Sequence, residues 1–293
     1  MPSGRSRCPV PSSARARASS VRRNRRLWDR QSRAYDRRHA AALGGRNALA
    51  WGLWRVPESK ARLLGPVRGR RILELGCGAA RWSIALRRRG ARAIGLDLSM
   101  AQLGRAGELG RSARVTLPLV RASAERLPFA DGSFDIAFSD WGASTFADPR
   151  HMVPECARVL RGGGRLVLVT GNPWSAVVID PRSGQFRHRL SRPYFGLHRL
   201  DDSPKEPVEY RLSYAGWFAL FRRNGFEVER LEETRPAPRA RSSYLNRAGH
   251  RFARSWPIET IWSVRKRPPA RRGGSRSRAP SPPKGSVRGR GTR

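Results

Sequence analysis

The amino-acid sequence predicts an α/β fold in which a mostly parallel β-sheet carries helices on both faces and ends in an antiparallel hairpin. Near-continuous apolar runs alternate with helical stretches, which is the pattern of buried parallel strands and their crossover helices. The last part of the chain instead follows the order helix, strand, loop and strand, which is typical of an antiparallel pair. We expect one main domain, because 293 residues with 39% hydrophobic content can bury one good-sized core.

The individual elements follow from apolar periodicity and from the residues that begin and end helices. The expected strands, in order, are residues 71–75, 91–96, 119–122, 134–139, 165–170, 226–231 and 260–264. The expected helices are one or two within residues 27–60, then 81–89, 99–109, 152–160 and 217–223. Ser99 is placed to cap a helix, Gly90 and Gly225 to end two others, and the glycines at 162–164 to close the helix before the fifth strand.

The net charge of +38 is concentrated at the two ends of the chain. Residues 1–26 carry eight Arg and no acidic residue, and residues 265–293 carry eleven Lys plus Arg and no acidic residue. Segments so rich in Arg, Ser, Pro and Gly bury too little apolar surface to offset the entropy of ordering. We expect residues 1–26 and 268–293 to be disordered basic tails around a domain at 27–267. Only four of the sixty basic residues are Lys, which favours a compositional bias over selection for nucleic-acid binding and leaves both open.

The cysteine and apolar content bears on the compartment. Cys8, Cys77 and Cys156 are too few and too scattered for a disulfide framework or a zinc site, so we expect no metal centre and a reducing cytoplasm. No stretch approaches the length of a membrane-spanning helix, and the N-terminus lacks the apolar core of a signal peptide. An Arg- and Ser-rich start without acidic residues leaves an organellar transit peptide as an alternative.

Residues 72–97 carry the strongest functional signal. An apolar strand enters a glycine turn, Gly76-x-Gly78, a helix follows, and the next strand ends on Asp97, which is how a nucleoside cofactor is held on a parallel sheet. A dinucleotide site needs a third glycine where this chain has Arg81, and a P-loop needs a Gly-Lys-Ser/Thr that is absent. The pattern therefore favours a cofactor without a pyrophosphate, whose ribose hydroxyls reach Asp97.

Four ordered motifs resemble those of the class I S-adenosylmethionine-dependent methyltransferases, especially the bacterial group similar to the ubiquinone and menaquinone biosynthesis methyltransferases. The matching segments are residues 74–80, Asp97, residues 123–129 with 133–135, and residues 158–164. The resemblance covers roughly residues 28–265. It implies a Rossmann-like sheet of seven strands with the last one antiparallel, S-adenosyl-L-methionine as cofactor, and a small-molecule methyl acceptor.

The resemblance also implies a set of cofactor-binding residues. They are Glu74, Gly76, Cys77, Gly78, Asp97, Leu98, Ser123, Ala124, Glu125 and Asp140. Ala80 replaces the third glycine of the usual turn, and we expect its side chain to narrow the cofactor pocket without closing it. Ser123 stands where family members often have Asp, so contacts to adenine are expected to depend more on Glu125 or on the backbone.

The acceptor is expected beyond the C-terminal end of the fourth strand, under a lid formed by residues 172–212. Asp140 and His198 are the candidate catalytic residues, with His198 as the base. The candidate pocket residues are Tyr35, Trp141, His151 and Tyr194.

Two other functions stay open at this point. One is an RNA or ribosomal-protein methyltransferase that uses the basic tails to hold phosphates, although the Asn/Asp-Pro-Pro-aromatic and Pro-Cys motifs of DNA methyltransferases are absent after the fourth strand. The other is a non-enzymatic basic binding protein on the same fold. The sequence does not predict the oligomeric state.

Overall fold

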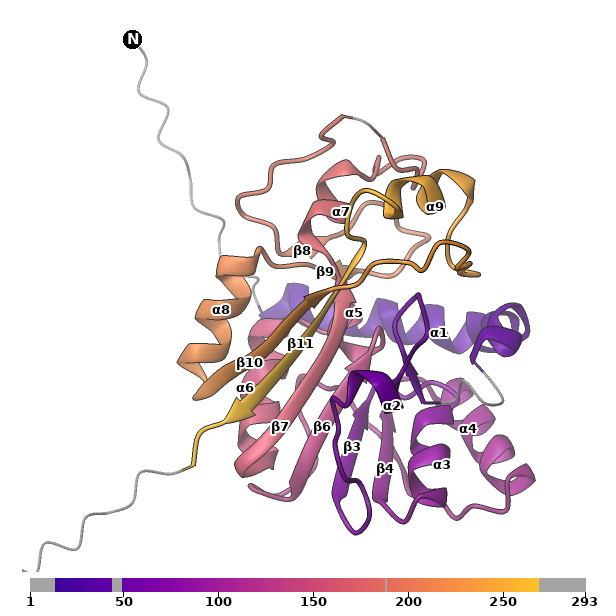
Figure 1. Cartoon of the computed structure of the whole chain (residues 1–293), viewed down its shortest axis with the longest axis vertical. Coiled ribbons are helices and arrows are strands. Elements are labelled where there is room, and N and C mark those ends of the chain that lie inside the picture. Colours follow the sequence, from indigo (N-terminus) through magenta and orange to yellow (C-terminus); the bar gives the residue numbers. More distant parts are fainter. Residues whose placement is uncertain (1–13, 44–48, 188, 269–293) are drawn as a thin grey trace, which may run out of the picture.

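The main sheet of the computed structural model, which describes residues 14–43, 49–187 and 189–268, has seven strands in the order β10–β11–β7–β6–β3–β4–β5. Their bounds are β3 Arg71–Leu75, β4 Arg92–Asp97, β5 Leu119–Arg121, β6 Phe134–Asp140, β7 Leu160–Gly171, β10 Phe226–Glu233 and β11 Glu259–Lys266. Neighbouring strands from β7 to β5 are parallel, whereas β11 is antiparallel to both β7 and β10. The predicted fold class, including the terminal antiparallel strand, is confirmed (Figure 1).

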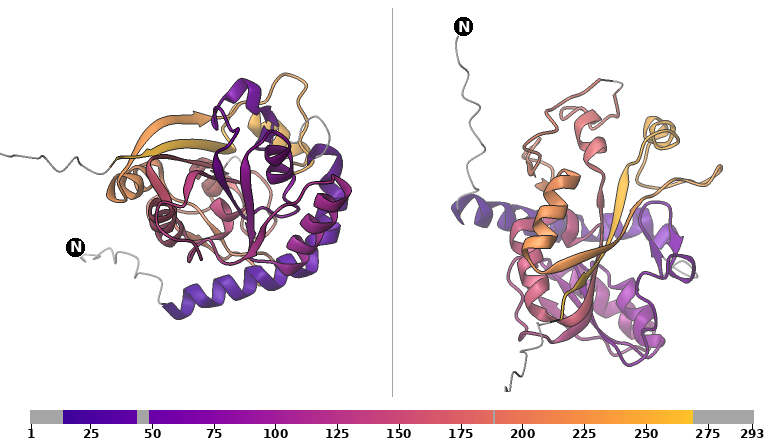
Figure 2. Two further views of the ribbon diagram at one scale, coloured as in Figure 1. Left: turned by 90° about the horizontal axis from the view of Figure 1, so that it is seen from below. Right: turned by 60° about the vertical axis from the view of Figure 1, so that its left-hand side comes forward.

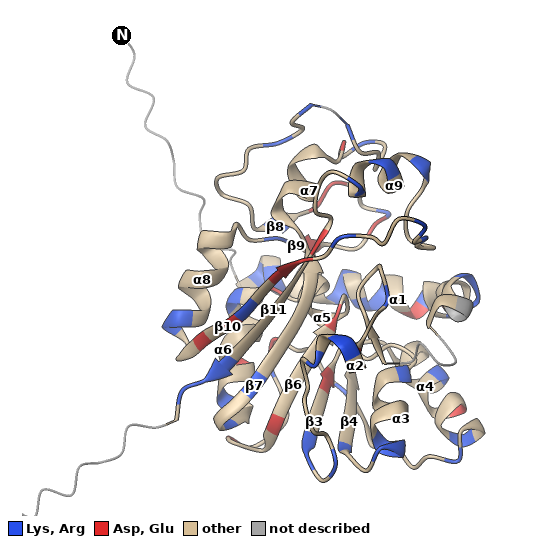
Figure 3. Ribbon diagram, in the orientation of Figure 1, with Lys and Arg blue, Asp and Glu red and all other residues tan. Residues whose placement is uncertain are grey.

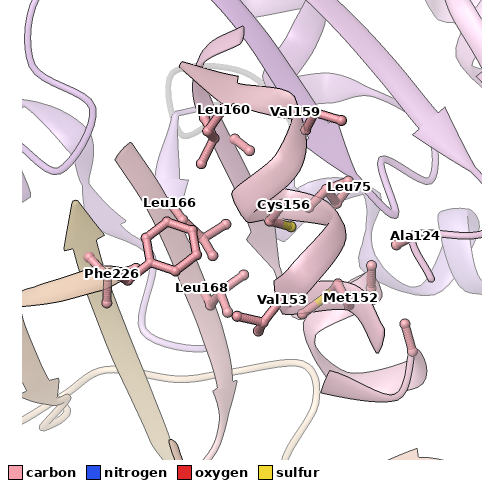
Figure 4. Close-up of a cluster of buried hydrophobic side chains, with 14 of the residues drawn as sticks. Leu75, Ala124, Met152, Val153, Cys156, Val159, Leu160, Leu166, Leu168 and Phe226 are labelled. Carbon is pink, nitrogen blue, oxygen red and sulfur yellow. The ribbon is translucent and has the colours of Figure 1, made fainter. Parts of the chain in front are cut away.

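Alternate residues of the central strands supply two apolar layers. On one face, Leu75 of β3 and Leu166 of β7 pack with Met152 and Cys156 of α6 (Figure 4). Leu220 and Phe221 of α8 belong to the same cluster. On the other face, Ile72 and Val167 pack against Trp82 of α3. Each buried side chain of this size stabilises the fold by about 1.5–3 kcal/mol, so the sheet is held from both sides.

The helices flank the sheet (Figures 1 and 2). Their bounds are α1 Ala14–Leu43, α2 Glu58–Ala61, α3 Arg81–Arg88, α4 Met100–Ser112, α5 Ala143–Phe146, α6 Pro149–Val159, α7 Pro173–Val178, α8 Tyr214–Arg223 and α9 Arg247–Ala253. Ser99 caps α4, as predicted, by accepting from Gln102 N–H at 3.2 Å. Gly90 and Gly225 follow helices with φ of +81° and +74°, as their positions predicted. No helix of the described residues is long and apolar enough to cross a membrane.

The N-terminal region differs from the prediction. Residues 14–26, predicted to be part of a disordered tail, form the first half of α1, because Leu27 and the polar Ser20 and Asn24 are buried against the rest of the fold. After α1, the chain forms a short hairpin, β1 Ala50–Trp51 and β2 Val56–Pro57, where only helices were expected. The predicted tails at residues 1–13 and 269–293 lie outside the described residues.

Two other segments also differ from the prediction. The glycines at 162–164 do not close a helix, because α6 ends at Val159 and β7 begins directly at Leu160. The segment 172–212 contains α7 and a small antiparallel pair, β8 Arg199–Leu200 and β9 Glu209–Tyr210, where the sequence showed only weak periodicity.

Candidate functional site

The glycine turn after β3 is tied to the end of β4. Gly76 N–H and Cys77 N–H donate to the Leu96 carbonyl at 2.8 and 3.0 Å, and Gly78 N–H donates to Asp97 Oδ2 at 2.8 Å. Gly76 and Gly78 have φ of +68° and +52°, the left-handed region in which a Cβ is unfavourable. The shape of the turn is therefore fixed by the strand that follows it.

Gly76 also contacts the loop after β6. A Cβ on Gly76 would lie 2.3 Å from Ala143 N, and one on Gly142 would lie 2.3 Å from Gly76 O. Both distances are far below any real contact, so the two strand ends approach this closely only because both positions are glycine.

Two buried carboxylates hold the turn and the helix that leaves it. Asp97 also accepts from Ser99 N–H at 2.8 Å, and burial raises its pKa against the opposing effect of the N–H groups of Ser99 and Gly78. Glu74 accepts from Ser83 N–H at 2.9 Å and from Ser83 Oγ at 2.5 Å, and burial raises its pKa to about 8. Carboxylates desolvated in this way favour a cationic neighbour.

Glu125 belongs to the segment that follows β5. Its Oε1 accepts from Asp148 N–H at 2.9 Å, and burial raises the pKa of Glu125 to about 7. Its own N–H donates to Ser123 Oγ at 3.2 Å. The segment is thus fixed between β5 and the start of α6.

These residues form one side of a cavity of about 510 Å³, which we call the turn side. All ten predicted cofactor residues line the cavity: Glu74, Gly76, Cys77, Gly78, Asp97, Leu98, Ser123, Ala124, Glu125 and Asp140. The other side, the cap side, is formed by α1, the β1–β2 hairpin, residues 141–147 after β6, and residues within 175–186, 209–211 and 244–258. Its larger lining side chains are Trp28, Tyr35, Arg55, Trp141, Phe146, Phe186, Arg211 and Tyr244.

Asp140 joins the two sides. It lies at the end of β6, where Oδ1 accepts from Gly52 N–H of the hairpin at 3.0 Å and Oδ2 accepts from Trp82 Nε1 at 3.3 Å. Arg55 Nη1 lies 3.9 Å from Oδ2. Burial raises the pKa of Asp140, against the opposing effect of Arg55.

A second buried carboxylate, Glu259, anchors the hairpin from β11. Oε2 accepts from Leu53 N–H at 2.7 Å and from Trp141 Nε1 at 2.8 Å, and Oε1 accepts from Thr234 Oγ1 at 2.6 Å. Burial raises the pKa of Glu259 to about 7. The hairpin tip is therefore held by carboxylates from two strands, Asp140 and Glu259.

Two tyrosines meet on the cap side. The hydroxyls of Tyr35, from α1, and Tyr244 lie 2.9 Å apart, and the ring of His39 stacks on Tyr244 with centroids 4.0 Å apart. His39 Nδ1 is 2.7 Å from Ser243 Oγ. Burial raises the pKa of both tyrosines, so both hydroxyls stay protonated at neutral pH.

Comparison with known proteins places the chain in a family. Residues 73–168 match the family model of a methyltransferase domain. A demethylmenaquinone methyltransferase of Corynebacterium kroppenstedtii is 32% identical over 185 residues, which are 63% of this chain and 74% of that protein. The chain belongs to the class I S-adenosylmethionine-dependent methyltransferases.

The similarity to other curated relatives covers a smaller part of the chain. A demethylmenaquinone methyltransferase of Clavibacter sepedonicus is 38% identical over 144 residues, 48% of this chain, and the chain spans only about half, 55%, of that protein. Among solved structures, a methyltransferase of Mesorhizobium loti has a TM-score of 0.58 at 24% identity, covering 71% of this chain and 96% of that one. Geranyl diphosphate C-methyltransferase of Streptomyces coelicolor has a TM-score of 0.61 at 18% identity, and the match covers 88% of this chain and 100% of that one. These likenesses show the same fold.

Three residues predicted for the acceptor site of this methyltransferase lie elsewhere. His198 Nε2 is 2.9 Å from Asp148 Oδ1, and His151 Nδ1 is 3.5 Å from Asp148 Oδ2, so both rings gather at the N-cap of α6 instead of lining the cavity. Tyr194 packs beside Trp174, with ring centroids 5.7 Å apart, and does not line the cavity either. The predicted positions of Tyr35 and Trp141 at the cavity agree with the structure.

Several site residues were missed by sequence reasoning. Glu259, Arg55, Arg211 and Tyr244 come from segments far from the glycine turn and carry no motif. The one available signal was a carboxylate at the start of an apolar strand, Glu259, which is 0% exposed. Among the described residues, no group of three or more His, Cys, Asp or Glu side chains is arranged to hold a metal ion.

Proposed function

We propose that this methyltransferase transfers the methyl group of S-adenosyl-L-methionine to a small aromatic acceptor that carries an ionisable hydroxyl. The observation that carries the proposal is the continuity of one cavity, whose turn side has the cofactor motifs and whose cap side has aromatic rings and a buried carboxylate. Cavities of this size enclose small molecules.

The turn side fits the cofactor. Asp97 lines the cavity and accepts from the N–H groups of Gly78 and Ser99, so its remaining lone pairs are available to ribose hydroxyls. Ser123 and Glu125 are positioned for the adenine end, and Gly76 and Gly78 keep the floor free of side chains under the amino-acid end. When bound, the cofactor supplies a sulfonium-activated methyl group, and its positive charge favours ionised Glu74 and Asp97.

The protein's part in the reaction is to position the acceptor, exclude water and accept a proton. Asp140 is the candidate base, because it lies where the two sides meet and burial raises its pKa toward the range in which a carboxylate accepts protons from weak acids. Arg55 is close enough to stabilise the anionic acceptor. We no longer propose His198 as the base, because its ring is hydrogen-bonded to Asp148 and does not line the cavity.

The cap side supports the acceptor class. Trp28, Trp141 and Phe146 offer flat apolar surfaces, and the Arg211 guanidinium lies 5.8 Å above the Trp141 ring. The neutral hydroxyls of Tyr35 and Tyr244 can donate to an acceptor oxygen. The names of the Corynebacterium and Clavibacter relatives give demethylmenaquinone as their acceptor, and a ring of that chemical type, a quinol or related phenol, is the acceptor we propose here.

The test is transfer of a labelled methyl group into the small-molecule fraction of a cell extract, measured by mass spectrometry. With Asp140→Asn we expect the rate at saturating S-adenosyl-L-methionine to fall at least ~100-fold, so that a loss of cofactor binding through this residue does not contribute. Asp135→Asn, the same change at the start of β6 and outside the cavity lining, is the matched control and should keep the rate. Label found only in RNA or protein would contradict the proposal. Full activity of Asp140→Asn would show that Asp140 is not the base.

A further inference from the structure

Helix α1 has two faces with different surroundings. Its inner face closes the cap side through Trp28 and Tyr35 and docks mostly through polar groups. Asn24, for example, donates to the carbonyls of Phe146 and Val208 at 3.0 and 2.9 Å. The helix is therefore both the cover of the cavity and a surface element, and Figure 2 shows it running along the outside of the molecule.

The outer face of α1 carries a continuous row of arginines, which we call the arginine stripe. Its members are Arg15, Arg22, Arg26, Arg30, Arg33 and Arg37, all exposed. With about 100° per residue they fall within an arc of about 80°, and they span about 33 Å along the helix axis. The basic residues on α1 are visible in Figure 3.

The charges of the stripe are not neutralised by the described part of the fold. Within the described residues, none of its six arginines forms a hydrogen bond or an ion pair, although the helix has ion pairs elsewhere, such as Asp36 with Arg81. The acids beside it are Asp29 of α1, which accepts from Ser99 Oγ at 2.6 Å, and Glu108 of α4, which pairs with Arg105 at 2.8 Å and also interacts with Arg33. A row of cations this long without matching acids fits an extended anionic surface.

The segment that contacts the N-terminal half of α1 through Arg199 carries exposed apolar side chains. Leu190 and Phe195 are 73% and 90% exposed, which is unusual for side chains of this size. Arg199 Nε donates to Ser20 Oγ of α1 at 3.1 Å, and Arg23 pairs with Asp201. Since Phe195 lies four positions before Arg199, its Cα is held within about 14 Å of the Cα of Arg199.

We propose that the arginine stripe of α1, together with Phe195, docks the protein on an anionic lipid bilayer. Arginines near such a surface are attracted by its negative potential, and apolar side chains beside them insert at the headgroup level. The choice of a bilayer over a nucleic acid rests on the proposed function, because the proposed apolar acceptor partitions into lipid. Docking places the cover of the acceptor cavity at the membrane surface.

The test uses the full chain without cofactor, so that it is independent of methyl transfer. Vesicles of phosphatidylcholine with about one-third phosphatidylglycerol should pellet the protein, and pure phosphatidylcholine vesicles should not. Replacing Arg22, Arg26, Arg30 and Arg33 by Gln should weaken the binding at least ~10-fold, and raising the salt concentration should weaken wild-type binding in the same direction. Phe195→Ser should remove the part of the vesicle binding that survives high salt.

The matched control removes four charges elsewhere. Arg68, Arg70, Arg222 and Arg223 are exposed and lie outside the stripe, and their replacement by Gln should change vesicle binding less than about twofold. Equal loss in both variants, or no preference for the anionic vesicles, would overturn the proposal. Binding of the wild type to single-stranded RNA that is tighter than to vesicles and lost in the stripe variant would replace the bilayer by a nucleic acid. Failure of methyl transfer alone leaves the vesicle result unaffected.

Discussion

The two sides of the cavity are built in different ways. The turn side comes from residues 74–98 and 122–125, and its hydrogen bonds join neighbouring strand ends, as between Gly78 and Asp97. The cap side joins segments that are far apart in the chain, as where Leu53 meets Glu259 across 206 residues. One side is a local motif on a sheet, and the other exists only once the whole chain has folded.

The turn side belongs to the part of the chain that matches the family model, whereas the cap side is the part that we expect to determine the methyl acceptor. The turn side lies within the residues that match the methyltransferase domain, 73–168. The cap side lies largely outside them, in α1, the hairpin and the segments after residue 178. A change on the turn side should therefore act on the fold and the cofactor together, whereas a change on the cap side should act on the acceptor and on local anchoring.

The largest expected effect comes from Gly76→Ala on the turn side. A Cβ there adds left-handed strain and a 2.3 Å clash with Ala143 N, so we expect the free energy of unfolding to fall by about 3–5 kcal/mol. Cofactor binding should be lost in the same variant. Chemical denaturation followed by fluorescence and calorimetry with S-adenosyl-L-methionine measure the two effects.

Gly69→Ala is the control for Gly76→Ala. Gly69 has a similar φ, +74°, but a Cβ on it would meet nothing within 4 Å. Gly69→Ala adds only the backbone strain, so its free energy of unfolding should fall by about 1–2 kcal/mol, and cofactor binding should be kept. Equal losses in the two variants would mean that the close approach of the strand ends does not constrain the turn.

The same contrast explains which parts could be predicted from sequence. All seven strands follow from apolar runs. The ten cavity-lining residues that the resemblance implies for the cofactor come from separate motifs, and they meet because sheet edges place the residues after successive strands together. His198 was misplaced because nothing local indicates that its ring would turn to Asp148. The arginines of residues 14–26 resemble a disordered tail, since their order depends on contacts such as Asn24 with Val208, 184 residues away. The cytoplasmic location, the lid role of residues 172–212 and the function of the terminal tails stay predictions.

Glu259 offers a smaller and pH-dependent test of the cap side. Its pKa is raised by burial to about 7 in the fold, above the ordinary value of 4.5, so the folded state binds the proton more tightly than the unfolded chain. The resulting stability is fully present below pH 4.5 and is lost as the pH rises through about 7. Because Glu259→Gln removes this titration, the stability difference between wild type and variant should shift by about 2–3 kcal/mol over that range.

The measurement for Glu259 is the free energy of unfolding at several pH values between 4.5 and 8. Glu74 and Glu125, with pKa values raised by burial to about 8 and about 7, give the wild type a slope of the same sign, so the comparison must be made between variants. Glu227→Gln, an exposed carboxylate on β10, is the control and should leave the slope unchanged. A Glu259→Gln slope identical to that of the wild type would show that Glu259 does not hold its proton in the fold.

The smallest expected effect distinguishes two roles for Ala80. The sequence predicted that its side chain narrows the cofactor pocket, but Ala80 is 0% exposed, packs with Leu103 and Ala106, and does not line the cavity. Its backbone is left-handed, with φ of +52° and ψ of +34°. Ala80→Gly relieves about 1–2 kcal/mol of backbone strain. It also removes a buried methyl group, which costs about 0.8 kcal/mol, and it increases the entropy of the unfolded chain, which lowers the stability further.

The net change in the free energy of unfolding for Ala80→Gly should therefore be a gain of less than about 1 kcal/mol, with the affinity for S-adenosyl-L-methionine unchanged. Ala79→Gly is the matched comparison, because Ala79 does line the cavity and lacks a positive φ, so it should lose stability by about 0.5–1 kcal/mol. Denaturation and calorimetry on both variants decide between the roles. Cofactor affinity that rises severalfold in Ala80→Gly would restore the narrowing predicted from sequence, and would mean that the turn shifts toward the cavity when the methyl group of Ala80 is present.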